Sequence, residues 1–216
     1  MLPALQYFDQ GRTACMAVCK LALPVEAVCT DQSITASTGS ATGFLIGPCL
    51  IATAGHALPT AHIAAASHAV FGDDQPHTTT VPNQRKRVVS DLRSGALAHS
   101  VVVHRVTRAV ACLQATLQLS PQDGFVHMPD LDITLCALAS APPRHQPVEA
   151  AAEPVRAGHP LSIIHHPRGA SKQLSLHGCR ALQVYDQSDS FTFDVVSDFG
   201  SSGAPVSSTP SLPRYS

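Results

Sequence analysis

The sequence predicts an all-β protein, and three observations support this prediction. Apolar segments are short and are separated by turn residues, with 17 Pro and 13 Gly scattered without a period through the 216 residues. Charged residues make up 13% of the chain, about half the usual share, which argues against a solvated coiled coil or an acidic disordered chain. Hydrophobic residues make up 44%, which is sufficient for a buried core. This combination favours a sandwich or barrel of short strands over long helices.

The first part of the chain predicts strands with one short helix. Met16–Leu23 mixes Val and Leu with small residues and is the first predicted strand. Gly43–Thr53, with the sequence GFLIGPCLIAT, has two apolar runs around a Gly-Pro turn and predicts a hairpin. Thr60–Val70 is rich in Ala and His and predicts a short helix. Further β-branched or compact apolar segments are Val88–Val89, Ser100–Val106 and Leu131–Leu138.

Beyond residue 140 the composition changes. Residues 141–160 contain five prolines and are the best candidate for a linker. Short apolar segments then alternate with turn residues, which again indicates a sheet of short strands. These segments are Leu161–His165, Gln173–Leu176, Arg180–Tyr185 and Phe191–Val196.

The charge balance and the apolar runs exclude several functional classes. Lys and Arg number 14, and Asp and Glu 15, which gives a net charge of −1 and no electrostatic footprint for nucleic acid. The basic run Arg85–Arg87 has no accompanying aromatic platform and is interpreted as a solvated loop. No segment approaches the roughly 20 apolar residues of a membrane span, and the N-terminus lacks the pattern of a secretory signal. We expect a cytoplasmic protein with no membrane or nucleic-acid partner.

Cysteine and histidine usage predicts neither a disulfide framework nor a metal site. Seven Cys without a C-x-x-C pair are more simply interpreted as small apolar core residues. Twelve His, including the pair His165–His166, occur without an H-E-x-x-H motif or a clustered Cys/His spacing. We interpret them as surface and turn histidines and expect no bound metal.

Three short segments contain the residue types of nucleophilic catalysis. Thr53–His56 (TAGH) follows the predicted hairpin, Asp132 opens the apolar run DITL, and Gly200–Pro205 (GSSGAP) follows the strand-like FTFDVV. Each segment has an ordinary structural explanation by itself: a structural histidine after a strand, a turn or cap aspartate, a flexible Gly-Ser loop. Together, in the order His, Asp, Ser, they are far more specific.

The chemistry requires these three residue types because a serine hydroxyl is a poor nucleophile near neutral pH. An imidazole at His56 would take the proton as the Ser202 oxygen attacks and return it to the leaving group. A carboxylate at Asp132 would fix the tautomer of that imidazole and stabilise the imidazolium. Gly200 permits a backbone conformation that directs N–H groups into a cleft. Its N–H and that of Ser202 would stabilise an oxyanion, with about 3–4 kcal/mol for one such donor.

These segments resemble the motifs of the trypsin/chymotrypsin-like serine peptidase family. GFLIGPCLIATAGH resembles the histidine motif, DITL the aspartate motif and GSSGAP the G-x-S-G-x-P nucleophile motif. The resemblance implies a serine endopeptidase with catalytic residues His56, Asp132 and Ser202 and an oxyanion hole at Gly200 and Ser202. It also implies a polypeptide substrate, no cofactor, and a fold of two antiparallel β-barrels of the trypsin-like type.

The resemblance implies a division of the chain into two barrels, of which the second is incomplete. Residues 12–140 would form the N-terminal β-barrel with His56 and Asp132, residues 141–160 a Pro-rich inter-barrel linker, and residues 161–216 a partial C-terminal β-barrel with Ser202. The family continues with further strands after its nucleophile, whereas this sequence soon ends. Missing strands would leave unpaired sheet edges and uncovered apolar side chains. We therefore expect a C-terminally truncated member, or one whose second barrel a partner completes.

Departures from the family pattern point to its bacterial trypsin-like or glutamyl-endopeptidase-like branch. Ser201 stands where secreted digestive members have an aspartate, and no I-V-G-G activation sequence occurs near the N-terminus. Ala57 follows the histidine, so the disulfide common at that place in the family is missing. The segment His165–Gly169 (HHPRG) resembles the short G-Y-P-x-G-type loop of these bacterial relatives.

The substrate pocket is less well specified. Val196 lies six residues before Ser202, where members that cleave after Lys or Arg have an aspartate, so a basic preference is not supported. Ser197 would present a hydroxyl to the pocket, as in relatives that prefer acidic side chains.

Two alternatives were compared with the peptidase. The pattern G-x-S-x-A at Gly200–Ala204 also suits the nucleophile elbow of an α/β-hydrolase, but that fold places its Asp and His after the Ser. The residues after Ser202 contain neither, so this interpretation is rejected. The second alternative, which stays open, is a catalytically inactive protease homologue that acts as a peptide- or protein-binding module, favoured by the short C-terminal region.

Overall fold

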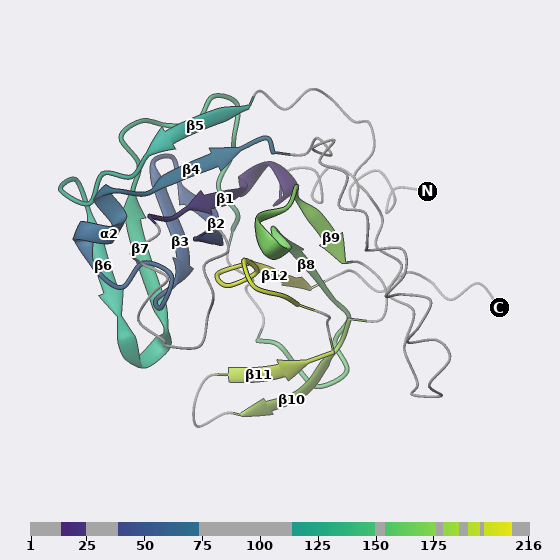
Figure 1. Ribbon diagram of the computed structural model, residues 1–216. Coiled ribbons are helices and arrows are strands. Elements are labelled where there is room, and N and C mark those ends of the chain that lie inside the picture. Colours follow the sequence, from purple (N-terminus) through teal and green to yellow (C-terminus); the bar gives the residue numbers. More distant parts are fainter. Residues whose placement is uncertain are drawn as a thin grey trace.

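The computed structural model describes residues 14–24, 39–73, 114–149, 154–175, 179–185, 190–194 and 197–208. These residues form mainly β-strands with few helices, as the sequence predicts (Figure 1). Short helical segments include α2 (Ala61–Ala65), η2 (Pro129–Leu131) and η3 (Pro167–Gly169). The strands are β1 (Val18–Ala22), β2 (Ser40–Gly47), β3 (Leu50–Ala54), β4 (His68–Phe71), β5 (Ala115–Gln118), β6 (Phe125–Met128), β7 (Ile133–Ala137), β8 (Leu161–His165), β9 (Gln173–Ser175), β10 (Ala181–Tyr185), β11 (Ser190–Phe193) and β12 (Val206–Ser208).

Seven of the described strands form one antiparallel sheet in the order β5–β4–β1–β2–β3–β7–β6. The predicted hairpin is confirmed: β2 pairs with β3, Leu45 lies opposite Ile51, and the chain turns at Pro48 and Cys49. On its other side β3 pairs with β7 from much later in the chain, with Ala54 opposite Ile133. The end of β3 and the beginning of β7 therefore lie at the same edge of the sheet.

The predicted helix over Thr60–Val70 is confirmed only in its first half. Thr60 is the N-cap of α2, and its side chain accepts a hydrogen bond from the Ile63 N–H. The helix ends early because the buried Ser67 hydroxyl donates to Ile63 O at 2.7 Å and the chain then turns into β4. β4 pairs with β1 and β5, so sheet pairing overrides the helical preference of the Ala-rich run.

The core of this sheet includes two of the predicted apolar thiols. Cys19 and Cys136 are fully buried and pack with residues such as Leu21, Ile51 and Phe71. Burial raises the pKa of the Cys19 thiol to about 12 and that of Cys136 to about 11, so both remain neutral near pH 7. The prediction is wrong for Cys49, which is exposed in the hairpin turn.

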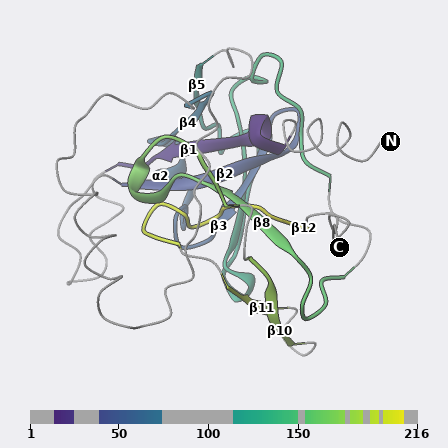
Figure 2. The ribbon, with the colours of Figure 1, turned by 90° about the vertical axis from the view of Figure 1, so that its right-hand side faces the viewer.

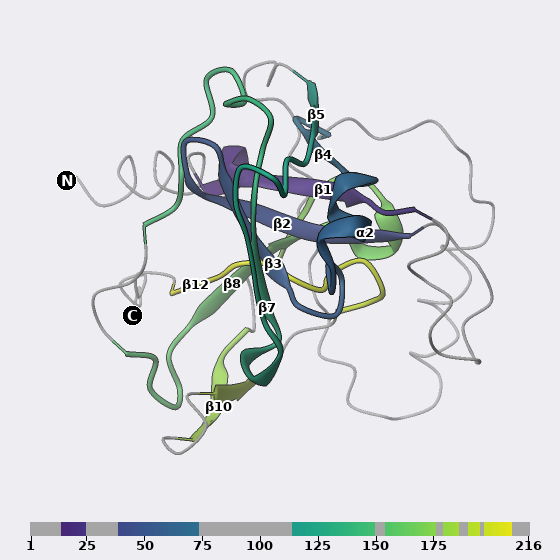
Figure 3. The same cartoon turned by 90° about the vertical axis from the view of Figure 1, so that its left-hand side faces the viewer.

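The second half of the chain contributes two smaller sheets. β8 lies between β9 and β12, and β10 pairs with β11. Residues of these strands and their neighbours form a small apolar cluster. Its buried members are Leu161, Cys179 and Ala181, against which Val155, Phe191, Phe193 and Val206 pack. The β10–β11 pair lies at the opposite end of the molecule from β5 (Figure 1, Figure 2). After a 90° turn that brings the left-hand side of Figure 1 to the front, β10 again lies at the opposite end of the molecule from β5 (Figure 3).

Several sequence predictions fall on residues outside the described ranges. These are Val88–Val89, Ser100–Val106 and the basic run Arg85–Arg87. The strands β5, β6 and β12 were not among the predicted segments. The boundaries 12–140, 141–160 and 161–216 stay a prediction, although the seven-stranded sheet and the two smaller sheets fall on either side of residues 141–160. No helix in the described ranges is long and apolar enough to cross a membrane.

The turn that follows β8 joins the two halves. Lys20 on β1 forms an ion pair with the buried Asp73, and its Nζ also donates to Gly169 O at 3.4 Å. The Lys172 N–H donates to Asp73 O at 2.9 Å. The turn from 166 to 172 is thus hydrogen-bonded to the seven-stranded sheet next to the segment that carries Ser202.

Candidate active site

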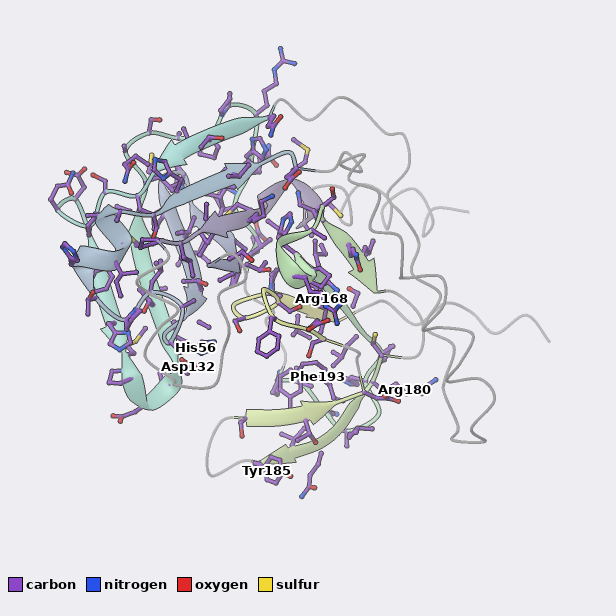
Figure 4. The ribbon with its side chains drawn as sticks, in the orientation of Figure 1. His56, Asp132, Arg168, Arg180, Tyr185 and Phe193 are labelled. Atoms are coloured by element: carbon purple, nitrogen blue, oxygen red, sulfur yellow. The ribbon has the colours of Figure 1, made fainter. Side chains whose placement is uncertain are left out.

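His56 and Asp132 lie together at the edge where β3 ends and β7 begins. Asp132 Oδ2 is 2.8 Å from His56 Nδ1, and Asp132 Oδ1 accepts the His56 backbone N–H at 2.7 Å. The Gly55 N–H donates to Asp132 O at 2.7 Å. The pairing of β3 with β7 thus brings together two residues that are 76 positions apart in the sequence, as the resemblance implies (Figure 4).

Local backbone geometry permits this close approach. Asp132 has φ +49°, a left-handed conformation that aspartate tolerates better than most side chains. An added Cβ at Gly55 would lie 3.0 Å from both the carbonyl carbon and Oδ1 of Asp132, so a larger residue there would press against Asp132. Because a carboxylate only accepts hydrogen bonds, Nδ1 of His56 carries the proton and Nε2 is left as the basic nitrogen.

The loop of residues 198–203, called here the 198–203 loop, lies against the beginning of β2 and the end of β3. The Thr42 N–H donates to Ser202 O at 2.9 Å. Gly203, with φ +81°, packs so closely that an added Cβ would lie 2.6 Å from Ala54 N, two residues before His56. No hydrogen bond joins Ser202 to His56 within the described residues. The fold therefore brings Ser202 to the same edge of the sheet as His56 and Asp132 without a direct bond between the serine and the histidine.

Four consecutive carbonyl groups of the 198–203 loop are hydrogen-bonded. Phe199 O accepts from Arg168 N, Gly200 O from Thr42 Oγ1, Ser201 O from Ala204 N, and Ser202 O from Thr42 N. The N–H groups of Gly200, Ser202 and Gly203 donate to no acceptor in the described part of the chain. Because the carbonyl and N–H of one trans peptide point in opposite directions, the Phe199 carbonyl bond turns the Gly200 N–H away from Arg168. The N–H groups of Gly200 and Ser202 therefore keep no protein acceptor among the described residues.

The turn after β8 holds the other side of the 198–203 loop. Arg168 forms an ion pair with Asp198, and its backbone N–H bonds Phe199 O. Arg168 has φ +55°, an unfavourable left-handed conformation for a long side chain. In Figure 4, Arg168 lies between the seven-stranded sheet and the β10–β11 pair. His165 Nδ1 is 2.8 Å from Ser201 Oγ, so the residue before Ser202 is also hydrogen-bonded to the end of β8.

Two buried histidines support this turn and are held neutral by burial. Desolvation lowers the pKa of His166 to about 4, helped by the charges of Lys172 and Lys20 and opposed by the bond to Ala170 O and by Asp73. Desolvation also lowers the pKa of His165. His166 Nδ1 bonds Ala170 O at 3.0 Å, and its buried Nε2 has no hydrogen-bond partner among the described residues. Burial removes the water that would solvate a proton on either ring. The prediction of surface and turn histidines is wrong for His165 and His166, which are buried.

Acidification is expected to destabilise the fold through His166. In the unfolded chain His166 binds a proton as the pH falls below about 6.5, whereas in the folded chain it does so only at about pH 4. The contribution of neutral His166 is therefore complete above pH 6.5 and is lost as the pH falls to 4, by roughly 3 kcal/mol. Urea unfolding between pH 4 and 7.5 measures this slope. His166→Asn, which keeps a donor for Ala170 O, should flatten it; an unchanged slope contradicts the assignment.

The remaining site predictions have different outcomes. Val196 lies outside the described residues, and Ser197 is exposed. Phe199, which is 72% exposed beside Gly200, was not predicted.

Sequence reasoning also missed Thr42, because one threonine at the beginning of a strand gives no distinguishing signal. The HHPRG segment did single out the turn that contains Arg168. The described residues contain no cluster of three metal-ligating side chains.

Comparisons with known proteins agree with this geometry. The sequence profile of the trypsin-like peptidase domain family matches residues 41–209. The uncharacterized protein y4fB of Sinorhizobium fredii is 26% identical over 223 residues, which cover 95% of this chain and 28% of y4fB. The chain thus spans less than a third of that relative's length.

Solved protease structures share the fold. The active form of the Rv3671c protease from M. tuberculosis aligns with a TM-score of 0.57 and 16% identity, over 94% of this chain and 70% of that chain. Deg5 aligns with a TM-score of 0.55 and 10% identity, over 96% of this chain and 82% of that chain. A serine endoprotease from Yersinia pestis aligns with a TM-score of 0.54 and 10% identity, over 94% and 53% of the two chains. At these identities the likeness shows the fold.

Proposed function

The chain belongs to the family of trypsin-like peptidase domains, and we propose that it is a serine endopeptidase that hydrolyses polypeptides through an acyl-enzyme. The observation that carries the proposal is the pair of hydrogen bonds that the Asp132 carboxylate accepts from the ring and backbone N–H groups of His56, at 2.8 and 2.7 Å, on the same sheet edge as Ser202. A carboxylate that orients an imidazole beside a serine is the arrangement needed to activate a hydroxyl.

In the proposed reaction Ser202 Oγ attacks the scissile carbonyl while His56 Nε2 takes its proton. The tetrahedral intermediate expels the amine, which receives that proton from His56, and the acyl group remains on Ser202. Water then attacks the ester with His56 again as base. Asp132 holds the ring and stabilises the imidazolium, and the N–H groups of Gly200 and Ser202 bind the oxyanion. These steps need no cofactor.

The substrate preference follows from fewer observations. The exposed hydroxyl residue Ser197 precedes the loop and would favour an acidic or polar side chain in the substrate. The exposed Phe199 ring would contact the substrate beside Gly200. The polypeptide class follows from the family, and the particular sequence cleaved would depend on these two side chains.

A binding module without catalysis is the second candidate, and two observations favour it. The side chains of His56 and Asp132 are 61% and 56% exposed, so water competes with the bonds between them. No hydrogen bond joins Ser202 to His56 within the described residues. In that role the exposed edge would bind a peptide without cleaving it.

A fluorophosphonate separates the two functions because it reacts with an activated serine. The folded wild type should acquire one label, located on Ser202 by mass spectrometry of the digested protein. Ser202→Ala should abolish the label, because the attacking oxygen is gone. Ser140→Ala, at an exposed serine outside the loop, is the matched control and should label fully. Absence of the label from folded wild type would favour the binding module.

A further inference from the structure

Thr42 lies where the seven-stranded sheet, the turn after β8 and the 198–203 loop meet. It is fully buried on β2. Its hydroxyl donates to Gly200 O at 2.7 Å and accepts the His166 N–H at 3.0 Å. Its own N–H donates to Ser202 O at 2.9 Å. Thr42 thus bonds the carbonyls on either side of Ser201, one through its side chain and one through its backbone.

The Gly200 carbonyl needs an external partner to fix its direction. Gly200 has φ +86°, in a region that glycine enters at little cost, so local preference alone does not fix its ψ. No larger residue can replace it, because an added Cβ would lie 2.6 Å from His166 O. The peptide after Gly200 is planar, so the bond from Thr42 Oγ1 sets the path of the chain into Ser201 and Ser202.

Among the residues that the structure describes, the Thr42 hydroxyl has no competing partner that would weaken this effect. It has one proton, which Gly200 O receives, and the His166 N–H occupies a lone pair on its oxygen. Both bonds are shielded from water, since Thr42 and His166 are buried. A hydrogen bond in such surroundings is costly to leave unmade.

We propose that Thr42 is a positioning residue for the peptidase reaction: its hydroxyl fixes the Gly200–Ser201 peptide and so constrains the two flanking peptides, whose N–H groups at Gly200 and Ser202 receive the oxyanion. This inference rests on the proposed function. Thr42 acts through the 198–203 loop, and its removal changes the orientation of the donors while leaving Ser202, His56 and Asp132 chemically intact.

The test compares two variants in the full chain. Thr42→Val removes the hydroxyl and keeps the shape of the side chain, whereas Thr42→Ser keeps the hydroxyl. The first readout is the second-order rate of modification by diisopropyl fluorophosphate, in which the Ser202 Oγ–P bond forms, the P–F bond breaks, and the serine proton passes to His56 as fluoride leaves. Thr42→Val should lower this rate about 10- to 100-fold, as a small misplacement of reacting groups does. Thr42→Ser should stay within about threefold of wild type.

The second readout measures how firmly the 198–203 loop is ordered and does not depend on any reaction at Ser202. Amide hydrogen exchange at Ser201 and Ala204 reports the loop, because their N–H groups donate to Asp198 O and Ser201 O at 3.0 Å. Thr42→Val should speed exchange at both amides. Ser67→Ala is the matched control: Ser67 is equally buried and its hydroxyl also donates to a backbone carbonyl at 2.7 Å, but it makes no hydrogen bond to the 198–203 loop within the described residues. It should change neither readout.

The outcomes separate this inference from the proposed function. Unchanged labelling and exchange in Thr42→Val, or equal changes in Ser67→Ala, would overturn the role of Thr42. If wild type is not labelled, the proposed function fails, and exchange alone then decides whether Thr42 orders the loop. If Thr42→Val does not fold, Thr42→Ala, which places no methyl group against Gly200 O, takes its place in both measurements.

Discussion

Replacement of His56 by alanine should lower the rate of ester or peptide hydrolysis roughly 10⁴- to 10⁶-fold, because Ser202 then has no base to take its proton. The free energy of unfolding should change by less than about 1 kcal/mol, since the His56 side chain is 61% exposed and its bond to Asp132 is open to water. Initial-rate kinetics and urea unfolding of the same preparations measure the two effects.

The control for this prediction is His62→Ala, at an exposed histidine on α2. It removes an exposed imidazole of the same size from the segment that follows His56 in the chain, and we expect it to hydrolyse substrate at the wild-type rate. A His56→Ala protein that is inactive because it has lost its fold contradicts the assignment of His56 as the base. Equal loss of activity in His62→Ala contradicts it as well.

Replacement of Gly203 by alanine should destabilise the fold by about 3–5 kcal/mol and lower fluorophosphonate labelling of Ser202 at least 100-fold. A Cβ at this position would collide with Thr42 O and Thr53 Oγ1 and lie 2.6 Å from Ala54 N. The φ of +81° adds the strain of a left-handed alanine. Relief of the collision would move the loop away from β3, and Ser202 would move with it. Urea unfolding and labelling rates measure both effects.

Gly158→Ala is the matched control for the collision. Gly158 has nearly the same φ, +83°, but an added Cβ there would meet no atom within 4 Å. This variant therefore carries the conformational strain without the contact, and should cost about 1 kcal/mol and leave labelling unchanged. If Gly203→Ala costs no more than Gly158→Ala, the close packing of the loop against β3 does not constrain Ser202.

Much of the fold was predictable because it depends on local patterns. The hairpin of β2 and β3 follows from two apolar runs around Gly47 and Pro48, and β8 and β10 coincide with apolar segments between turn residues. β5, β6 and β12 were missed because they are three or four residues long and only partly buried, so their sequences carry little hydrophobic periodicity. β4 was missed because its pairing with β1 and β5 outweighs the helix preference of the preceding alanines.

The sequence by itself determined the family resemblance and the choice of His56, Asp132 and Ser202 as the proposed catalytic residues, because the chemistry needs those side chains inside short, recognisable motifs. It also indicated a glycine conformation at Gly200, whereas the close contacts at Gly55 and Gly203 came from the tertiary structure. Only the tertiary structure decided that β3 pairs with β7 in the register that brings Asp132 to His56. Only the tertiary structure showed that Thr42, Arg168 and His165 contact the 198–203 loop. The physical reason is that these contacts join segments far apart in the chain, several through backbone atoms that every residue possesses and no local pattern distinguishes.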